Sequence, residues 1–105
     1  MNNQNEASAV FSDLKVLDSK VRLSILNFLN ENRREYSFSE ISVQLSNIDK
    51  GLLQLHLGIL YISNMIKNHG FDTEAKYSIT PKGADLLQKL KSDETAESII
   101  SEVIA

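Results

Sequence analysis

The stretch DKGLLQLHLGIL, residues 49–60, contains no proline and opens with Asp49, a residue type that often caps a helix. Wound as a helix, it turns Lys50, Gln54 and Leu55 away from the side that holds most of its leucines. A glutamine amide can pair with adenine through two hydrogen bonds, a lysine can reach a phosphate or a guanine, and a leucine can contact a thymine methyl. These three side chains are therefore candidates for contacts in the major groove of DNA.

Two glycines lie on the same outward side of this predicted helix. Gly51 and Gly58 have no side chain with which to read a base, and each weakens a helix by roughly 1 kcal/mol relative to alanine. Their smooth surface allows a DNA backbone to come close, and it allows another helix to pack there equally well. Leu55 also suits a protein contact as well as a DNA contact, so both kinds of partner stay open.

Basic residues outside this helix are candidates for phosphate contacts. Lys67, His69 and Lys76 fall in a predicted hairpin, from which they can reach the sugar-phosphate backbone or the minor groove. Asp72 and Glu74 share the loop of that hairpin and would repel phosphate, so a hairpin that only meets solvent is the alternative.

Four further phosphate candidates come earlier in the chain, namely Lys20, Arg22, Ser37 and Ser39. Arg22 offers a guanidinium, and Ser39 lies near the start of a predicted helix, where free backbone N–H groups favour an anion. Arg33 and Arg34 fall in a polar connector, for which a solvated loop is the better interpretation.

Metal-binding and catalytic chemistry find little support in the sequence. The chain has no cysteine, which excludes a disulfide framework and a thiolate metal site. His56 lies at the rim of an apolar helix face, where a packed and hydrogen-bonded histidine is the better interpretation, and His69 is distant from it in sequence. The sequence has no glycine-rich phosphate loop and no nucleophile motif. We expect no metal site, no cofactor and no enzymatic activity.

The composition is that of one small soluble domain, with 105 residues of which 42% are hydrophobic and 24% charged. The longest apolar-rich segment, residues 52–66, is too short and too polar to span a membrane, and the N-terminus lacks the features of a secretory signal, so a cytoplasmic location is expected. The net charge is −3, but the tail over 92–105 holds four acids and no base, which leaves +1 for residues 1–91. This balance permits nucleic-acid binding without strong electrostatic attraction.

Apolar periodicity and capping signals predict the helices that would position these side chains. Helical spacing predicts one helix over 9–17 and a core helix that Asp18 would cap. Ser37 and Glu40 have the spacing of a capping box at the start of the next helix. The helix that follows Asp49 should continue to about residue 62.

After this helix, the spacing of the apolar residues changes from a helical to a strand-like period. Asn64 suits the left-handed backbone that ends a helix, and two short strands near 65–68 and 76–79 read as a hairpin. Thr80 and Pro81 mark the start of another helix. A helix-turn-helix followed directly by a hairpin is typical of the winged-helix arrangement, a mainly α (α+β) fold with a two-stranded β wing.

Four segments occur in an order that is typical of one family. VRLSIL reads as an opening core helix, FSEISVQL as the first helix of a helix-turn-helix, and YSITPKG as a wing strand that leads into the last helix. GLLQLHLGIL matches the recognition-helix pattern G-x-L-x-x-H-[LI]-x-x-L through Gly51, Leu53, His56, Leu57 and Leu60. Over about residues 9–91 the chain thus resembles the small archaeal and bacterial winged-helix regulators of the ArsR/MarR superfamily.

The resemblance implies a dimeric transcriptional regulator with its recognition helix, about residues 50–62, in the major groove and its wing, about 65–79, on the backbone or minor groove. The thiol metal-sensing motif of ArsR proteins is missing because the chain has no cysteine. The resemblance therefore does not carry metal sensing to this chain. It does not carry a MarR-type ligand pocket either, because the chain is too short to establish one.

Apolar residues near both ends of the chain need a partner for burial. We expect a disordered N-terminus over 1–7, a DNA-binding domain over 8–91 and an acidic dimerisation helix over 92–105. The implied homodimer joins the N- and C-terminal helices through Val10, Phe11, Leu14, Ile99, Ile100, Val103 and Ile104. A two-fold dimer suits a palindromic DNA site.

The leading hypothesis is a homodimeric regulator that binds double-stranded DNA. Its predicted DNA contacts are Lys50, Gly51, Gln54, Leu55, Gly58, Ser39, Arg22, Lys67, His69 and Lys76. The alternative is a winged-helix module that binds a protein partner through the same smooth helix face and has little or no affinity for DNA.

Overall fold

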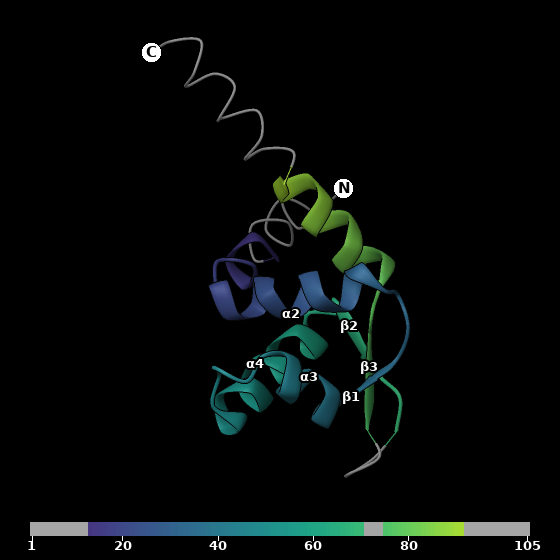
Figure 1. Cartoon of the computed structure of the whole chain (residues 1–105). Helices are drawn as coiled ribbons and strands as arrows, with labels where there is room; N and C mark the ends of the chain where they lie inside the picture. The colour runs from purple at the N-terminus through teal and green to yellow at the C-terminus, as the bar shows by residue number, and fades with distance from the viewer. Residues whose placement is uncertain (1–12, 71–74, 92–105) are drawn as a thin grey trace.

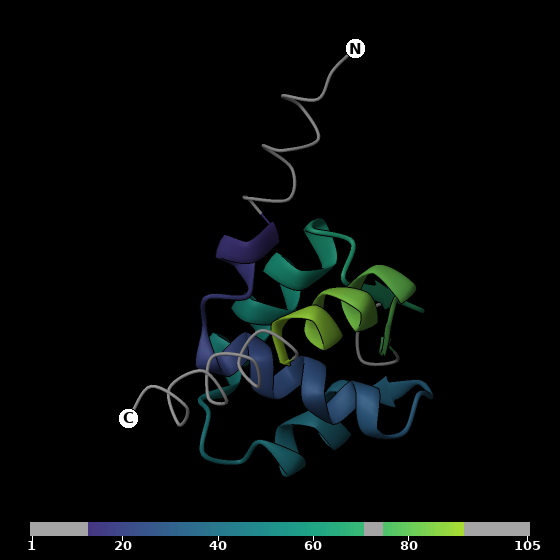
Figure 2. The same ribbon diagram turned by 90° about the horizontal axis from the view of Figure 1, so that it is seen from above.

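The computed structural model of the chain describes residues 13–70 and 75–91. The predicted disordered N-terminus, the acidic tail, the acids Asp72 and Glu74, and most of the predicted dimer contacts lie outside these residues. Figure 1 shows helix α2 between a helix over 81–91 on one side and the pair α3 and α4 on the other, with a small sheet along one edge. Seen from above, helix 81–91 lies beside α2 (Figure 2). Among the described residues, no helix is long and apolar enough to cross a membrane.

Helix α2, Lys20–Glu31, lies in the middle of the molecule and buries Ile25, Leu26 and Leu29. Its N-cap is Ser19, whose hydroxyl accepts a hydrogen bond from the backbone N–H of Arg22 at 3.3 Å. The prediction of Asp18 as the cap is therefore wrong by one residue. The backbone N–H of Asp18 closes the preceding turn on the carbonyl of Lys15, so the chain becomes extended only at Ser19.

Strand β1, Tyr36–Ser37, leads without a break into helix α3, Phe38–Gln44. The predicted capping box is confirmed: the Ser37 hydroxyl accepts from the N–H of Glu40 at 3.1 Å, and the Glu40 carboxylate accepts from the N–H of Ser37 at 3.0 Å. That backbone hydrogen bond and the Arg34 guanidinium hold the pKa of Glu40 below its usual range. Two backbone N–H groups that the start of a helix would leave without partners are thus hydrogen-bonded by side chains close in sequence.

Helix α4, Lys50–Ile62, agrees with the predicted bounds of the recognition helix. Asp49 caps it by accepting from the N–H of Leu52 at 3.1 Å, as predicted. At its other end Asn64 has a φ of 62°, the left-handed conformation expected there. The predicted inward face is also confirmed, because the fully buried residues of α4 are Leu53, Leu57 and Leu60.

The sheet has three antiparallel strands in the order β1-β3-β2, where β2 is Ile66–Asn68 and β3 is Lys76–Ile79. The predicted hairpin is confirmed, with Ile66 opposite Ile79. The third strand, β1, places Ser37 opposite Lys76. Pairing across some 40 residues gives no local signal in the sequence, which is why a two-stranded wing was predicted.

Helix 81–91 is fixed where α4 ends and the sheet begins. The Thr80 hydroxyl accepts from the N–H of Gly83 at 3.0 Å and donates to the carbonyl of Asn64 at 2.7 Å. A Cβ at Gly83 would collide with the carbonyl of Met65, so only glycine allows this approach. The Lys82 ammonium donates to the carbonyl of Ser63 at 3.0 Å and so satisfies the end of α4.

Candidate nucleic-acid interface

The exposed side of α4 is lined mainly with hydrocarbon. Gly51, Leu55, Gly58 and Ile62 follow one another at spacings of four, three and four residues, opposite the buried leucines, and we call this row the outward line. Leu55 is 59% exposed and Ile62 is 80% exposed. Side chains this apolar are usually covered when they lie together on one surface, so the outward line is a candidate binding surface.

Polar groups flank the first turns of the outward line. Lys50 and Gln54 are exposed on one side of it, and Leu52 is exposed on the other. Within Lys50–Ile62 there is no acidic side chain to repel a phosphate. The Asp49 carboxylate, which caps the helix, already occupies the positive end of the helix dipole.

The two glycines of α4 differ in what surrounds them. A Cβ added at Gly51 would lie 3.1 Å from the capping carboxylate of Asp49, so glycine there makes room for the cap. A Cβ added at Gly58 would meet nothing within 4 Å, so the fold gains nothing from its absence. Gly58 therefore has no explanation inside the described part of the chain.

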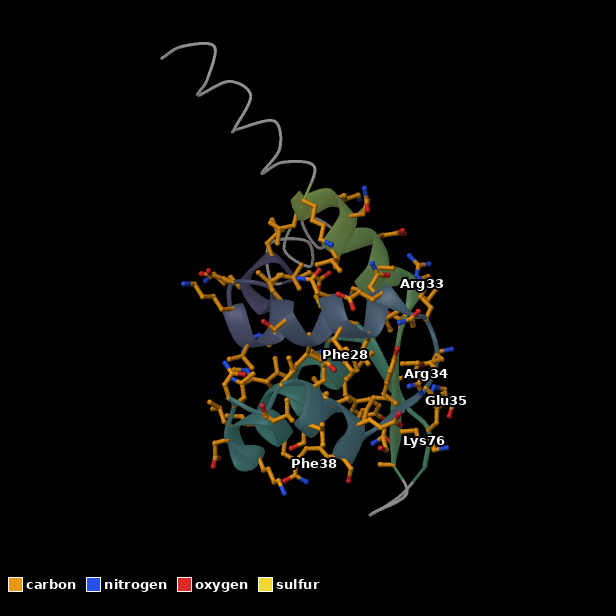
Figure 3. All side chains as sticks on the ribbon, viewed as in Figure 1. Phe28, Arg33, Arg34, Glu35, Phe38 and Lys76 are labelled. Atoms are coloured by element: carbon orange, nitrogen blue, oxygen red, sulfur yellow. The ribbon has the colours of Figure 1, made fainter. Side chains whose placement is uncertain are left out.

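A hollow of about 370 Å³ separates α3 from the start of α4. Three serine hydroxyls and one ammonium line it beside three apolar side chains, namely Ser39, Ser42, Ser46, Lys50, Phe38, Val43 and Ile48. Figure 3 shows Phe38 at the end of the molecule that α3 and α4 form. Hydroxyls and an ammonium are donors that suit phosphate oxygens. Ser39 was predicted, whereas Ser42 and Ser46 were missed, although they follow Ser39 at successive helical spacings of three and four residues.

A second hollow, of about 400 Å³, lies between the end of α4 and strand β2. Its lining contains Lys67 and His69 together with the polar side chains of Tyr61, Asn64, Asn68 and Thr80. The His69 ring is held against β3, with Nε2 at 2.7 Å from the Ser78 hydroxyl. Two of the predicted backbone contacts, Lys67 and His69, are thus brought to the side of α4, and Asn64 was not predicted as a contact.

The wing turns its basic residues outward. Side chains alternate along a strand, so the exposed Lys67 and its partner Ser78 lie on the face opposite to the buried Ile66. Lys76, two residues before Ser78, shares that outer face. Figure 3 shows Lys76 along the edge of the molecule that also carries Arg34 and Glu35. Lys76 therefore lies towards β1 rather than towards α4.

A third hollow, of about 470 Å³, lies between the end of α2, strand β1 and α3. Arg34 stacks over the ring of Tyr36, with 3.9 Å from its central carbon to the ring centre, and forms a salt bridge with Glu40 at 3.0 Å. Its two charged side chains neutralise each other. This hollow therefore has no net charge to attract a charged ligand, and α4 is the better candidate for the centre of an interface.

This arrangement agrees with known structures. No family model and no curated protein sequence matches the chain. The transcriptional repressor BigR from Xylella fastidiosa has a similar structure, with 28% identity, a TM-score of 0.69, and coverage of 90% of this chain and 91% of that chain. A putative MarR-family transcriptional regulator from Enterococcus faecalis is 18% identical, with a TM-score of 0.74 and coverage of 97% and 91%.

A third similar structure is the homodimeric winged helix-turn-helix DNA-binding domain of Mb0332 from Mycobacterium bovis, a possible ArsR-family transcriptional regulator. Its sequence is 18% identical to this chain, the TM-score is 0.73, and the match covers 90% of this chain and 85% of the Mb0332 chain. The chain has the winged helix-turn-helix fold of ArsR- and MarR-type regulators. The predicted fold class and resemblance are confirmed.

Within this winged helix, Arg22 occupies a different place from the one predicted. Its guanidinium donates through Nε to the carbonyl of Val16, and its Nη1 lies 3.0 Å from Nδ1 of His56. These partners are internal and join α2 to α4, so the prediction of Arg22 as a phosphate contact is not supported by its position. This contact was not predicted because Arg22 and His56 are 34 residues apart in sequence.

The expectation of a packed, hydrogen-bonded histidine at position 56 is confirmed by the same contact. Nδ1 of His56 faces a guanidinium that can only donate, so the neutral ring carries its proton on Nε2. Burial and the neighbouring charge of Arg22 both lower the pKa of His56. His56 therefore supports the winged helix from inside.

Residues 13–70 and 75–91 contain no group of three or more side chains that could hold a metal ion. Leu14 is 47% exposed in the single protomer, so its side chain is accessible for the predicted dimer contact. The other predicted dimer contacts lie outside the described residues.

Proposed function

We propose that this winged helix is a DNA-binding transcriptional regulator that acts as a homodimer and has no enzymatic activity. The observation that carries the proposal is the exposed, acid-free face of α4, flanked by two hollows with hydrogen-bond donors. The similar structures are transcriptional regulators, and one of them is a homodimeric DNA-binding domain.

Helix α4 enters the major groove with its exposed side towards the base edges. Gln54 pairs with an adenine, and Lys50 reaches a guanine or a phosphate from the first turn. Ser39 and the other hydroxyls of the hollow beside α3 hold the phosphates that flank the groove. These backbone contacts position the helix but do not select a sequence.

The wing holds the backbone or minor groove beside the major-groove site. Lys67 and His69 approach it from the hollow beside α4, and Lys76 from the outer face of the sheet. So few cations predict modest affinity and a shallow dependence on salt, because each phosphate contact adds roughly 0.9 to the logarithmic slope.

Two protomers present their α4 helices to two half-sites. The tail over 92–105 joins Leu14 and its neighbours in the dimer contact. In a two-fold complex the half-sites lie about one helical turn apart, roughly 10 base pairs. The operator should therefore be palindromic.

A second candidate function is a module that binds a partner protein. It is favoured by the exposure of Leu52, Leu55, Tyr61 and Ile62 on one helix, since such clusters commonly mark protein contacts. The two candidates differ in whether duplex DNA binds at all.

A gel-shift titration at low salt with a random-sequence duplex library and with the DNA upstream of the protein's own gene separates them. The double variant Lys50→Ala/Gln54→Ala should lose most of the affinity. The double variant Lys89→Ala/Gln88→Ala removes the same residue types from exposed positions on helix 81–91 and should bind as the unchanged protein does. Light scattering verifies that each variant keeps its oligomeric state. No shift with any duplex would reject the DNA-binding function and leave the protein-binding one.

A further inference from the structure

The outward side of α4 offers more hydrocarbon than hydrogen-bonding groups. Leu52, Leu55 and Ile62 are all exposed there, whereas Gln54 is the only amide and Lys50 the only lysine of the helix. A helix that read its site by hydrogen bonds alone would need more donors and acceptors than these two side chains supply.

The major-groove edges of the four bases differ in what they offer an apolar side chain. Guanine, cytosine and adenine present only hydrogen-bonding groups, and thymine presents a C5 methyl beside its O4 acceptor. A leucine pressed against the polar edge of guanine or cytosine leaves those groups without water and without partners, which is costly. The same leucine against a thymine methyl buries two apolar groups. The chemistry of α4 thus discriminates in favour of thymine.

The two glycines leave the outward line bare on either side of Leu55. Gly51 comes four residues before Leu55 and Gly58 three residues after it, so no side chain of the outward line covers Leu55 in the adjacent turns. Since a Cβ at Gly58 would meet nothing within 4 Å, the glycine weakens α4 without any gain in packing. A bound partner that comes close to the backbone at Gly58 would account for a glycine at this position, since packing within the fold does not.

We propose that α4 recognises thymine through its C5 methyl, with Leu55 in contact with the methyl and Gly58 as the point of closest approach. Gln54, one residue before Leu55, pairs with adenine in a neighbouring A·T pair, so each half-site centres on consecutive A·T pairs. This inference rests on the proposed DNA-binding function and adds to it the base that is read and the residue that reads it.

Deoxyuridine provides the test, because it keeps every hydrogen-bonding group of thymidine and lacks only the methyl. Duplexes that bind the full chain are selected from a random-sequence library, and each thymine of the selected site is then replaced singly by deoxyuridine. We expect A·T-rich half-sites, with at least one position at which the replacement lowers affinity about fourfold, the effect of one buried methyl-sized group.

The variant Leu55→Ala should bind the thymine and deoxyuridine forms of that position equally well. The control is Val43→Ala, which removes hydrocarbon from an exposed site on α3 at the edge of the hollow beside it. Whatever its effect on overall affinity, it should keep the full fourfold difference between the two forms. Thermal melts check that both variants fold, as expected for exposed positions.

Three results overturn the inference. If no duplex binds at low salt, the DNA-binding function fails and the inference fails with it. If the chain selects a site but binds its fully deoxyuridine-substituted form equally well, the function stands and methyl recognition is wrong. If Leu55→Ala keeps the sensitivity of the unchanged protein at every position, another side chain reads the methyl.

Discussion

The two faces of α4 are built from the same residue type and do opposite things. Leu53, Leu57 and Leu60 are fully buried against the core, and Leu55 is more than half exposed although only one residue separates it from Leu57. Composition alone does not distinguish these leucines. What distinguishes them is the side of the helix on which they lie, so one face of α4 belongs to the fold and the other is available to a partner.

The largest expected contrast is between Leu57→Ala and Leu55→Ala. Truncating the buried Leu57 should lower the free energy of unfolding by about 3 kcal/mol, because it removes apolar contacts and leaves a cavity. Truncating the exposed Leu55 should change it by less than about 0.5 kcal/mol. Urea denaturation followed by circular dichroism measures both. Equal losses would mean that the outward face is part of the core.

A pair of glycines sharpens the comparison. Gly83→Ala should destabilise the chain by about 2 kcal/mol, because the new Cβ collides with the carbonyl of Met65. Gly58→Ala should stabilise it by about 1 kcal/mol, since alanine favours a helix and the site is open. The same Gly58→Ala variant should bind DNA less tightly. If Gly58→Ala is more stable and binds DNA as tightly as the unchanged protein, a close approach of DNA at Gly58 is contradicted.

The wing should contribute to affinity without affecting stability. Lys67→Ala should reduce the slope of log affinity against log salt by about 0.9 through the loss of one phosphate contact. Lys89→Ala is the control, because it removes an exposed lysine from helix 81–91. Binding isotherms at several salt concentrations give the slopes. Unchanged slopes in both variants would place Lys67 outside the interface.

The smallest expected effect concerns His56, at the border between the two faces. Its pKa is lowered in the folded chain, so the unfolded chain binds more protons as the pH falls. The stability that neutral His56 contributes is complete above the unfolded pKa of about 6.5 and decreases as the pH falls from there through the folded pKa. Urea titrations between about pH 5 and 7.5 should show this decrease, and His56→Gln should remove it. The variant His69→Gln should retain it.

Local signals predicted much of the fold. The capping box of Ser37 and Glu40, the Asp49 cap and the left-handed Asn64 each depend on a few adjacent residues, and the bounds of α4 followed from them. The Ser19 cap was missed because Asp18 is an equally good residue type for a helix cap. The backbone N–H of Asp18 is bound to the carbonyl of Lys15 in the preceding turn, and the sequence does not reveal that turn.

Long-range contacts explain what the sequence did not predict. Pairing of β1 with β3 and the contact between Arg22 and His56 join residues far apart in the chain, so no spacing announces them. For the candidate site, the helix face was predictable from periodicity. The hollows beside it depend on how α3 and β2 pack against α4, which only the three-dimensional arrangement provides.

Thr80 has a mechanical consequence. Its hydroxyl donates to the carbonyl of Asn64 and accepts from the N–H of Gly83, and the Lys82 ammonium donates to the neighbouring carbonyl of Ser63. The start of helix 81–91 and the end of α4 are therefore joined by two side-chain hydrogen bonds. A tilt of the last helix would move the end of α4 with it, and with it the position of α4 against a bound partner.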